Sequence, residues 1–196
     1  FGRVLFLSWR GESRVEKILE GDFARVEDAA LSALGPLIVV SNLPYSAGAA
    51  IFVSLCERSK QIPEMVLMFQ AEVAKRLYAD PSTPDRGSLS LYIQNEWDVE
   101  RLIEVKPGAF KPPPKVMSEV VTLKRREQTR VDVSSAELRD RFNELLKKSF
   151  AHRRKMLRGN LTGEPFKGAL ARSGVDPTLR AESLTWDDWT KLWSQL

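Results

Sequence analysis

The sequence has few of the residues that several common kinds of catalytic site require. Of its 196 residues, one is cysteine, Cys56, and one is histidine, His152. A single cysteine excludes an internal disulfide and fits a reducing compartment. A single histidine leaves almost no material for histidine-based metal sites or a Ser-His-Asp triad. Because Cys56 follows Ile51, Phe52 and Leu55 at helical spacing, we expect it in the core rather than as a nucleophile.

Long apolar runs are also missing. None approaches the length of a membrane span, and no signal peptide is evident, so we expect no membrane partner. With 43% hydrophobic and 29% charged residues, the chain has the composition of a globular protein with one ordinary core and a small second domain. A net charge of +4 and a pI of about 9.3 favour a polyanionic partner, although many basic proteins bind none. Nothing in the sequence asks for a metal, and we expect a monomer.

The most informative stretch is residues 37–45, Leu-Ile-Val-Val-Ser-Asn-Leu-Pro-Tyr. Its four leading apolar residues predict a buried parallel strand that is covered on both faces. Pro44 cannot continue the strand ladder and biases Leu43 to an extended conformation. Asn42 and Tyr45 are therefore presented at the carboxyl end of a strand, where open α/β sheets bind their ligands. The alternative interpretation is an ordinary strand-to-helix turn.

The segment Asn42-Leu43-Pro44-Tyr45 resembles the Asn/Asp-Pro-Pro-Tyr/Phe motif of methyltransferases that modify exocyclic amino groups of bases. The lone pair of such a nitrogen is delocalised into the ring, which makes it a poor nucleophile. Acceptors for its two hydrogens, the Asn42 side-chain oxygen and the Leu43 carbonyl, would favour a pyramidal nitrogen with a localised lone pair. Tyr45 would stack on a base that has left its helix or loop.

The segments that follow predict a continuing α/β domain. Helices are expected over residues 47–58, 70–78 and 88–94, and strands over residues 65–69 and 97–105, with a turn-rich loop at 80–87. Residues 116–123 alternate between two sets of side chains, which predicts a half-buried antiparallel edge strand.

A proline-rich stretch lies between those last two strands. Three consecutive prolines favour a stiff extended run, which would hold Phe110 between Lys111 and Lys115. An aromatic residue between cations suits stacking on a base with its phosphates nearby. A rigid connection whose phenylalanine is a hydrophobic plug fits equally well, and both interpretations stay open.

Beyond this stretch the pattern becomes helical. We place the domain boundary between residues 127 and 128. Ser134 and Glu137 fit a capping box, and apolar residues from Leu138 onward repeat at helical spacing. Thr185 and Asp188 fit a second capping box. Three tryptophans and the terminal leucine there predict a core-facing helix stripe rather than a ligand site.

A basic cluster follows the first of these helical segments. Its six cations, with no acid among them, span about three turns of a predicted helix: Lys147, Lys148, Arg153, Arg154, Lys155 and Arg158. Cations at a helix end also suit the helix dipole. Six exceed what capping needs, so the cluster favours a surface that contacts phosphates.

Together, these stretches resemble the ribosomal RNA adenine dimethyltransferases of the kasugamycin-resistance type, from about Glu20 to the C-terminus. The matching pieces are Glu20-Gly-Asp-Phe23, Asn42-Leu-Pro-Tyr45, Phe69-Gln70 with Glu72-Val73 and Arg76-Leu77, Gly87-Ser-Leu-Ser90, Ala109-Phe110, Pro112-Pro-Pro-Lys115-Val116, Phe150 with Arg153-Arg-Lys155 and Arg158, and Val175-Asp-Pro177 with Arg180-Ala-Glu182.

The resemblance implies an α/β fold: a Rossmann-like methyltransferase domain followed by a small all-helical RNA-binding domain. It implies transfer of methyl groups from S-adenosylmethionine to the amino groups of two adjacent adenosines. The implied target is a hairpin loop near the 3′ end of small-subunit ribosomal RNA, in the immature small subunit, during ribosome biogenesis. Because no transit peptide is visible in this sequence, we expect a bacterial cytoplasmic source rather than a mitochondrial one.

The resemblance also implies roles for particular residues. Asp22 would hold the cofactor adenine, with Phe23 beside it and Asn42 bordering the cofactor. Tyr45 and Phe110 would sandwich the target base. The RNA phosphates would be held by the remaining candidates, namely Lys111, Lys115 and the six cations of the basic cluster.

The N-terminal part departs from the family pattern. The Gly-x-Gly-x-Gly turn is absent, and Ser8 stands where an acidic residue would hold the cofactor ribose, if residues 4–7 are the preceding strand. The segment after it is too short for the usual helix. We therefore expect that this sequence is part of a longer chain and lacks the cofactor-binding segment. In that case, S-adenosylmethionine binding by this part alone should be weak or absent, and the part alone inactive.

Three other functions remain possible from the sequence. The erythromycin-resistance type modifies an adenosine of large-subunit RNA, but the basic cluster and residues 175–182 favour the small-subunit type. A non-catalytic RNA-binding assembly factor fits the missing glycine-rich turn, whereas the intact motif at Asn42 argues against it. DNA adenine methylation has similar chemistry, and charge alone does not distinguish the two nucleic acids.

Overall fold

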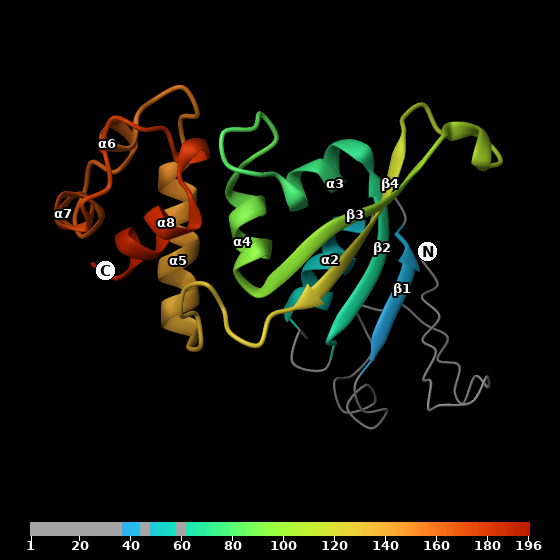
Figure 1. Cartoon of the computed structure of the whole chain (residues 1–196), viewed down its shortest axis with the longest axis horizontal. Helices are drawn as coiled ribbons and strands as arrows, with labels where there is room; N and C mark the ends of the chain where they lie inside the picture. The colour runs from blue at the N-terminus through green and yellow to red at the C-terminus, as the bar shows by residue number, and fades with distance from the viewer. Residues whose placement is uncertain (1–36, 44–47, 58–61) are drawn as a thin grey trace. The chain divides into compact units, whose positions relative to one another are not determined.

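The computed structural model describes residues 37–43, 48–57 and 62–196 (Figure 1). Four of the predicted site residues lie outside the described residues, as does the segment 4–7 that is considered above as a strand. These four are Asp22, Phe23, Pro44 and Tyr45.

The described strands form one mixed four-stranded sheet in the order β1-β2-β4-β3. The strands are β1 (Ile38–Asn42), β2 (Glu64–Gln70), β3 (Trp97–Val105) and β4 (Ser118–Arg125). β1 runs parallel to β2, while β4 runs antiparallel to both of its neighbours, β2 and β3. The predicted strands at 65–69 and 97–105 are confirmed.

The expectation that residues 116–123 form an edge strand is wrong. β4 lies between β2 and β3, and β3 is the outer strand on that side of the described sheet. Val121 and Leu123 are fully buried, whereas Val120 and Thr122 are half-buried. Alternation reports that one face of a strand is more buried than the other. It carries no information on how many of the strand's edges are paired.

Helix α2 (Gly48–Glu57) contributes buried side chains to the core of the sheet domain. The rings of Phe52 and Phe69 meet edge to face, with centroids 5.2 Å apart, and Cys56 is buried as predicted. On β1, Val39 is buried, but Ile38 and Val40 are 51% and 66% exposed. The described residues thus cover one face of β1, whereas the apolar run predicted cover on both.

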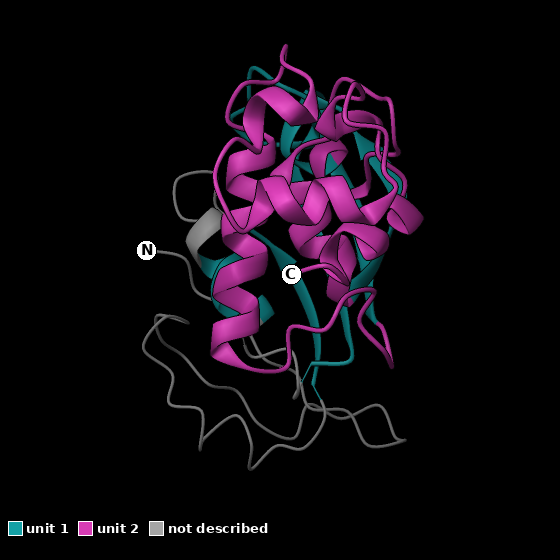
Figure 2. Ribbon diagram, turned by 90° about the vertical axis from the view of Figure 1, so that its left-hand side faces the viewer, with its two compact units in different colours: residues 1–74, 97–125 teal, residues 75–96, 126–196 magenta. Residues whose placement is uncertain are grey.

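The chain divides into two compact units (Figure 2). Unit 1 comprises residues 1–74 and 97–125, and unit 2 comprises residues 75–96 and 126–196. Helix α3 (Ala71–Tyr78) is divided between them. The units do not follow a single cut in the chain, because residues 75–96 join the C-terminal helices.

All regular structure described in unit 2 is helical. Beyond the end of α3 it consists of α4 (Ser88–Glu96), α5 (Ala136–Ser149), α6 (Leu157–Asn160), α7 (Phe166–Ser173), η4 (Ala181–Ser183) and α8 (Trp186–Trp193). Leu91 of α4 belongs to the same buried cluster as Phe142 of α5 and Trp189 of α8. The predicted tryptophan stripe is confirmed as core packing, because Trp186, Trp193 and other apolar residues pack against this cluster.

One of the two predicted helix caps is confirmed. Thr185 and Asp188 form the expected capping box of α8. The predicted box at Ser134 is wrong. Ser135 is the N-cap of α5 and accepts a hydrogen bond from the Leu138 N–H at 3.1 Å, while the Ser134 N–H donates to Asp132. Two adjacent serines offer alternative caps, and the start of the helix decides between them.

No helix in the described part of the chain is long and apolar enough to cross a lipid bilayer.

Candidate functional site

The predicted motif begins at the carboxyl end of β1. Asn42 is the last residue of this strand and lies opposite Met68 of the parallel strand β2. Its side chain is exposed and makes no hydrogen bond to another described residue, whereas the next side chain, Leu43, is buried. A Cβ on Gly48, the first residue of α2, would lie 3.2 Å from the Leu43 Cβ, so the chain passes close to Leu43. The Leu43 side chain is therefore packed beside the start of α2, whereas the Asn42 side chain is exposed to solvent.

The Phe110 segment leaves the sheet at the same edge. In β4, Ser118 lies opposite Gln70, the last residue of β2, and also opposite Val105, the last residue of β3. The Ala71 N–H donates to the Met117 carbonyl at 2.9 Å, which ties the end of this segment to the start of α3. Since Asn42 pairs near the end of β2, the motif and the Phe110 segment share one edge of the sheet.

The Phe110 segment has a defined backbone conformation. It begins with the short helix η3 (Pro107–Ala109), and the Phe110 N–H donates to the Pro107 carbonyl at 3.1 Å. A cis peptide bond follows between Lys111 and Pro112. Phe110 is half-buried, while Lys111 and Lys115 are exposed. The backbone around Phe110 is therefore defined, with a helical turn in front of the extended run, and the two lysines that follow Phe110 are exposed.

The basic cluster does not lie on one continuous helix. Helix α5 ends at Ser149, and α6 begins at Leu157, so Arg153, Arg154 and Lys155 lie in the turns between them. Phe150 ends α5, because its backbone leaves the helical conformation (φ −98°, ψ 5°) and its N–H donates to carbonyls of the last turn. The charge pattern alone did not reveal this end, which has neither glycine nor proline next to it.

The six cations differ in the hydrogen bonds and ion pairs that they form with other residues. Arg153 donates from Nη2 to the carbonyls of Pro84 (2.7 Å) and Arg86 (3.0 Å), and its Nε lies 3.9 Å from a Glu182 oxygen. Arg153 thus links the turns after α5 to the loop before α4. Lys148 lies 3.6 Å from a Glu144 carboxylate oxygen and 5.6 Å from the centroid of a phenylalanine ring.

The other four, Lys147, Arg154, Lys155 and Arg158, are exposed and form no ion pair with another described residue.

The Arg86 side chain, which no sequence pattern predicted as a functional residue, is buried in the loop before α4. Its Nη1 donates to the Ala79 carbonyl at 2.6 Å and to Gln94 Oε1 at 3.0 Å. Burial lowers the pKa of this guanidinium to about 10, against the opposing effect of Asp80 and with a smaller contribution from Arg130. A lone arginine beside a turn-rich loop gives no sequence signal of burial, since arginine is rarely buried.

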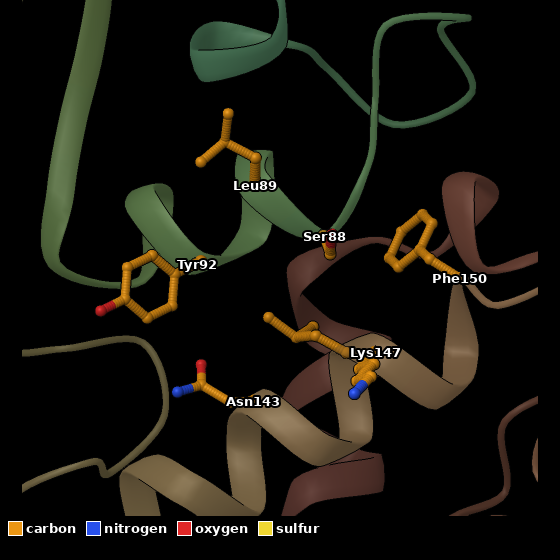
Figure 3. A pocket seen from close by; sticks show the side chains of 7 residues that line it. Ser88, Leu89, Tyr92, Asn143, Lys147 and Phe150 are labelled. Carbon is orange, nitrogen blue, oxygen red and sulfur yellow. The ribbon is translucent and has the colours of Figure 1, made fainter. Parts of the chain in front are cut away.

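Two pockets adjoin this loop in unit 2. One, of about 380 Å³, lies between α4 and α5 (Figure 3), and the other, of about 290 Å³, shares Ser88, Leu89 and Phe150 with it. Tyr92 and Asn143 also line the larger pocket, and neither belongs to a sequence motif. Among the described residues, no group of His, Cys, Asp and Glu side chains is placed to hold a metal ion.

Comparison with solved structures identifies the fold. A dimethyladenosine transferase from Plasmodium falciparum superposes with a TM-score of 0.64 at 21% identity, over 79% of this chain and 65% of that one. The 23S rRNA methyltransferase ErmE gives 0.65 at 21% identity, over 92% and 71%. The fold is therefore that of a Rossmann-like methyltransferase with an added helical unit.

Sequence comparison identifies the family. The family model for ribosomal RNA adenine dimethylase matches residues 7–196. The chain belongs to the ribosomal RNA adenine dimethylase family. It is 36% identical over 177 residues to the ribosomal RNA small subunit methyltransferase A of Syntrophotalea carbinolica, and 38% identical over 186 residues to that of Macrococcus caseolyticus. These alignments cover 88% and 90% of this chain but 66% and 62% of the relatives, so the chain spans slightly less than two thirds of their length.

Proposed function

We propose that the protein methylates the exocyclic amino groups of two adjacent adenosines in the 3′-terminal hairpin loop of small-subunit ribosomal RNA. The observation that carries this proposal is the exposed Asn42 at the carboxyl end of β1, next to the buried Leu43. The small-subunit assignment follows the names of the two relatives reported above, each of which is a ribosomal RNA small subunit methyltransferase A.

Asn42 and Leu43 would activate the adenine nitrogen. The Asn42 Oδ1 and the Leu43 carbonyl would each accept a hydrogen bond from the amino group, so the nitrogen lone pair would become localised on the side facing the methyl donor. The buried Leu43 side chain would help to hold this carbonyl in place as an acceptor. S-adenosylmethionine would supply the methyl group as an electrophile, and the amino proton would be lost after the methyl has arrived.

Other predicted residues would hold the cofactor and the base. Asn42 is the described candidate for contact with S-adenosylmethionine, and its exposed amide has both donors and acceptors for a polar group. Asp22 and Phe23 are proposed for the cofactor adenine. Phe110 would stack on the target base from the same sheet edge, with Tyr45 on the opposite face of the base.

The exposed cations would hold the RNA backbone. Lys111 and Lys115 follow the proposed stacking residue, while Arg154 and Lys155 are exposed in the turns after α5. The other candidate phosphate ligands in unit 2 are Lys147, Lys148, Arg153 and Arg158. Arg153 and Lys148 already have internal partners, so we assign them smaller direct contributions.

We further propose a monomer that acts in the cytoplasm on the immature small subunit. In the proposed domain division, residues 1–127 form the catalytic domain and residues 128–196 form the RNA-binding domain.

Transfer of labelled methyl groups from S-adenosylmethionine to separate, unmethylated ribosomal subunits tests the proposal. The full-length protein that contains this chain should label small subunits and leave large subunits unlabelled. Label in the large subunit would instead support the erythromycin-resistance type, whose representative ErmE shares the fold. Tight RNA binding without methyl transfer to either subunit would indicate an assembly factor.

A further inference from the structure

A groove in unit 2 crosses the start of α4 and the end of α5. It consists of the two pockets, of about 380 and 290 Å³, that share Ser88, Leu89 and Phe150. The larger one falls within the range of about 300–1,000 Å³ that small-ligand sites occupy. It is therefore large enough for a planar group the size of a nucleobase.

The walls of the larger pocket are aromatic and apolar. Figure 3 shows Phe150 and Tyr92 on opposite sides of it, with Leu89 above. The Phe150 ring stacks on Trp189 behind it, with centroids 6.1 Å apart and planes 17° apart, and Trp189 is fully buried. Phe150 is thus a supported flat surface, and a base stacking on it would not have to order it first.

Two polar side chains lie beneath these walls, on α5. Figure 3 shows Asn143 and Lys147 bordering the pocket opposite Leu89. Both are exposed, and neither makes a hydrogen bond or ion pair with another described residue. An amide offers a donor and an acceptor to a base edge, and an ammonium offers a charge to a phosphate.

The smaller pocket adds further positive charge. Arg76 and Arg153 line it, together with one carboxylate, Asp85. Counting Lys147, the whole groove has three cations and one anion among its lining residues. This excess favours a ligand that carries negative charge beside an aromatic ring.

We infer that this groove binds one unpaired nucleotide of an RNA, away from the proposed methyl-transfer site. The base lies against Phe150 with its edge at Asn143, and its phosphates lie towards Lys147, with a smaller contribution from Arg153, which already donates to the Pro84 and Arg86 carbonyls. The inference rests on the proposed function only in taking RNA as the ligand. If the inference holds, the protein should bind RNA that carries unpaired bases more tightly than an abasic RNA backbone of equal charge.

Fluorescence anisotropy tests this with a labelled single-stranded RNA of about ten nucleotides and an abasic strand of the same length. Ser88→Trp fills the groove without removing a charge. It should weaken binding of the RNA about tenfold and leave the abasic strand unaffected, because only base stacking is lost. Lys147→Ala should weaken both strands and reduce the slope of log K against log salt by about 0.7.

The matched control is Lys191→Ala. Lys191 is an exposed unit-2 lysine already paired with Asp187 at 2.6 Å, so its removal should change neither strand's affinity. Equal RNA affinity in Ser88→Trp and wild type, or an equal loss for both strands, would overturn the inference. Should Ser88→Trp fail to fold, Phe150→Tyr and Phe150→Leu take its place, and only the leucine variant should lose the preference for bases. A methyl-transfer assay is run separately. If the protein binds RNA in the way described here but transfers no methyl group, only the proposed function is wrong.

Discussion

The Asn95 side chain forms two hydrogen bonds with the backbone of Val131, which lies 36 residues away in the sequence. The Val131 N–H donates to Asn95 Oδ1 at 2.8 Å, and Asn95 Nδ2 donates to the Val131 carbonyl at 3.2 Å. Both residues are buried. This pair joins the end of α4 to the segment that leads into α5, and it helps to explain why residues 75–96 form one compact unit with the C-terminal helices.

Replacing Asn95 by leucine should therefore destabilise unit 2. The leucine side chain has a similar branched shape, but the buried N–H and carbonyl of Val131 lose their partner. We expect the free energy of unfolding to fall by about 2–4 kcal/mol, measured by urea denaturation. Asn143→Ala is the control, since this asparagine is exposed and should change stability by less than about 0.5 kcal/mol. Similar values for the two variants would contradict the role given to Asn95.

The sequence predicted local structure well and long-range pairing poorly. The strand over residues 97–105 and the capping box at Thr185 follow from nearby residues, and both are confirmed. The interior position of β4 depends on which strands pair with it, and the Asn95–Val131 pair depends on segments far apart in the chain. Hydrophobic periodicity contains neither kind of information.

Gln94 should be the most sensitive polar residue around Arg86. It accepts from Arg86 and donates from Nε2 to the carbonyls of Leu77 (3.0 Å) and Ala79 (3.1 Å). Gln94→Leu leaves the buried guanidinium with one acceptor, so we expect a loss of about 3 kcal/mol in the free energy of unfolding. Adding Arg86→Met should restore part of this stability, because the unpaired charge is then gone. A double variant that is less stable than Gln94→Leu would argue against this explanation.

Asp176 should make unit 2 sensitive to acid. Hydrogen bonds from the Thr178 hydroxyl (2.7 Å) and the Thr178 N–H (2.8 Å) lower the pKa of this carboxyl below its ordinary value. The carboxylate therefore stabilises the fold above the ordinary pKa of about 3.9, and this contribution is lost as the pH falls through the lowered pKa. Asp176→Asn should be less stable than wild type at pH 7, with a difference that shrinks in acid. Parallel stability–pH curves would refute the assignment.

Phe110 should matter for catalysis as an aromatic ring. In Phe110→Ala the stacking on the target base is lost, which should lower kcat/KM for methyl transfer at least about tenfold. Phe110→Tyr keeps the ring and should stay close to wild type. If Phe110 is instead a hydrophobic plug, the alanine variant should lose thermal stability in proportion to its activity, and a melting curve alongside the assay separates the two roles.

The site was only partly predictable for a physical reason. The Asn42 motif follows directly on a strand in the sequence, so its place at a sheet edge could be predicted. The basic cluster was predicted as one surface, but the structure engages Arg153 and Lys148 internally. The groove around Phe150 depends on the packing of α4 against α5, which lie about 50 positions apart in the sequence. Some of its lining residues, such as Ser88 and Leu89, belong to a family motif, but no local pattern showed that they meet at one groove.

The most direct test of the central claim compares Asn42→Ala with Ser41→Ala in the full-length protein. Unmethylated small subunits are incubated with S-adenosylmethionine, and the RNA nucleosides are analysed by mass spectrometry. The account predicts dimethyladenosine at two adjacent positions with wild type and with Ser41→Ala, and a loss of about 10²–10³ in rate with Asn42→Ala, as for removal of a transition-state hydrogen-bond partner. Equal rates for the two variants would show that Asn42 does not activate the amine, and the proposed mechanism would be wrong.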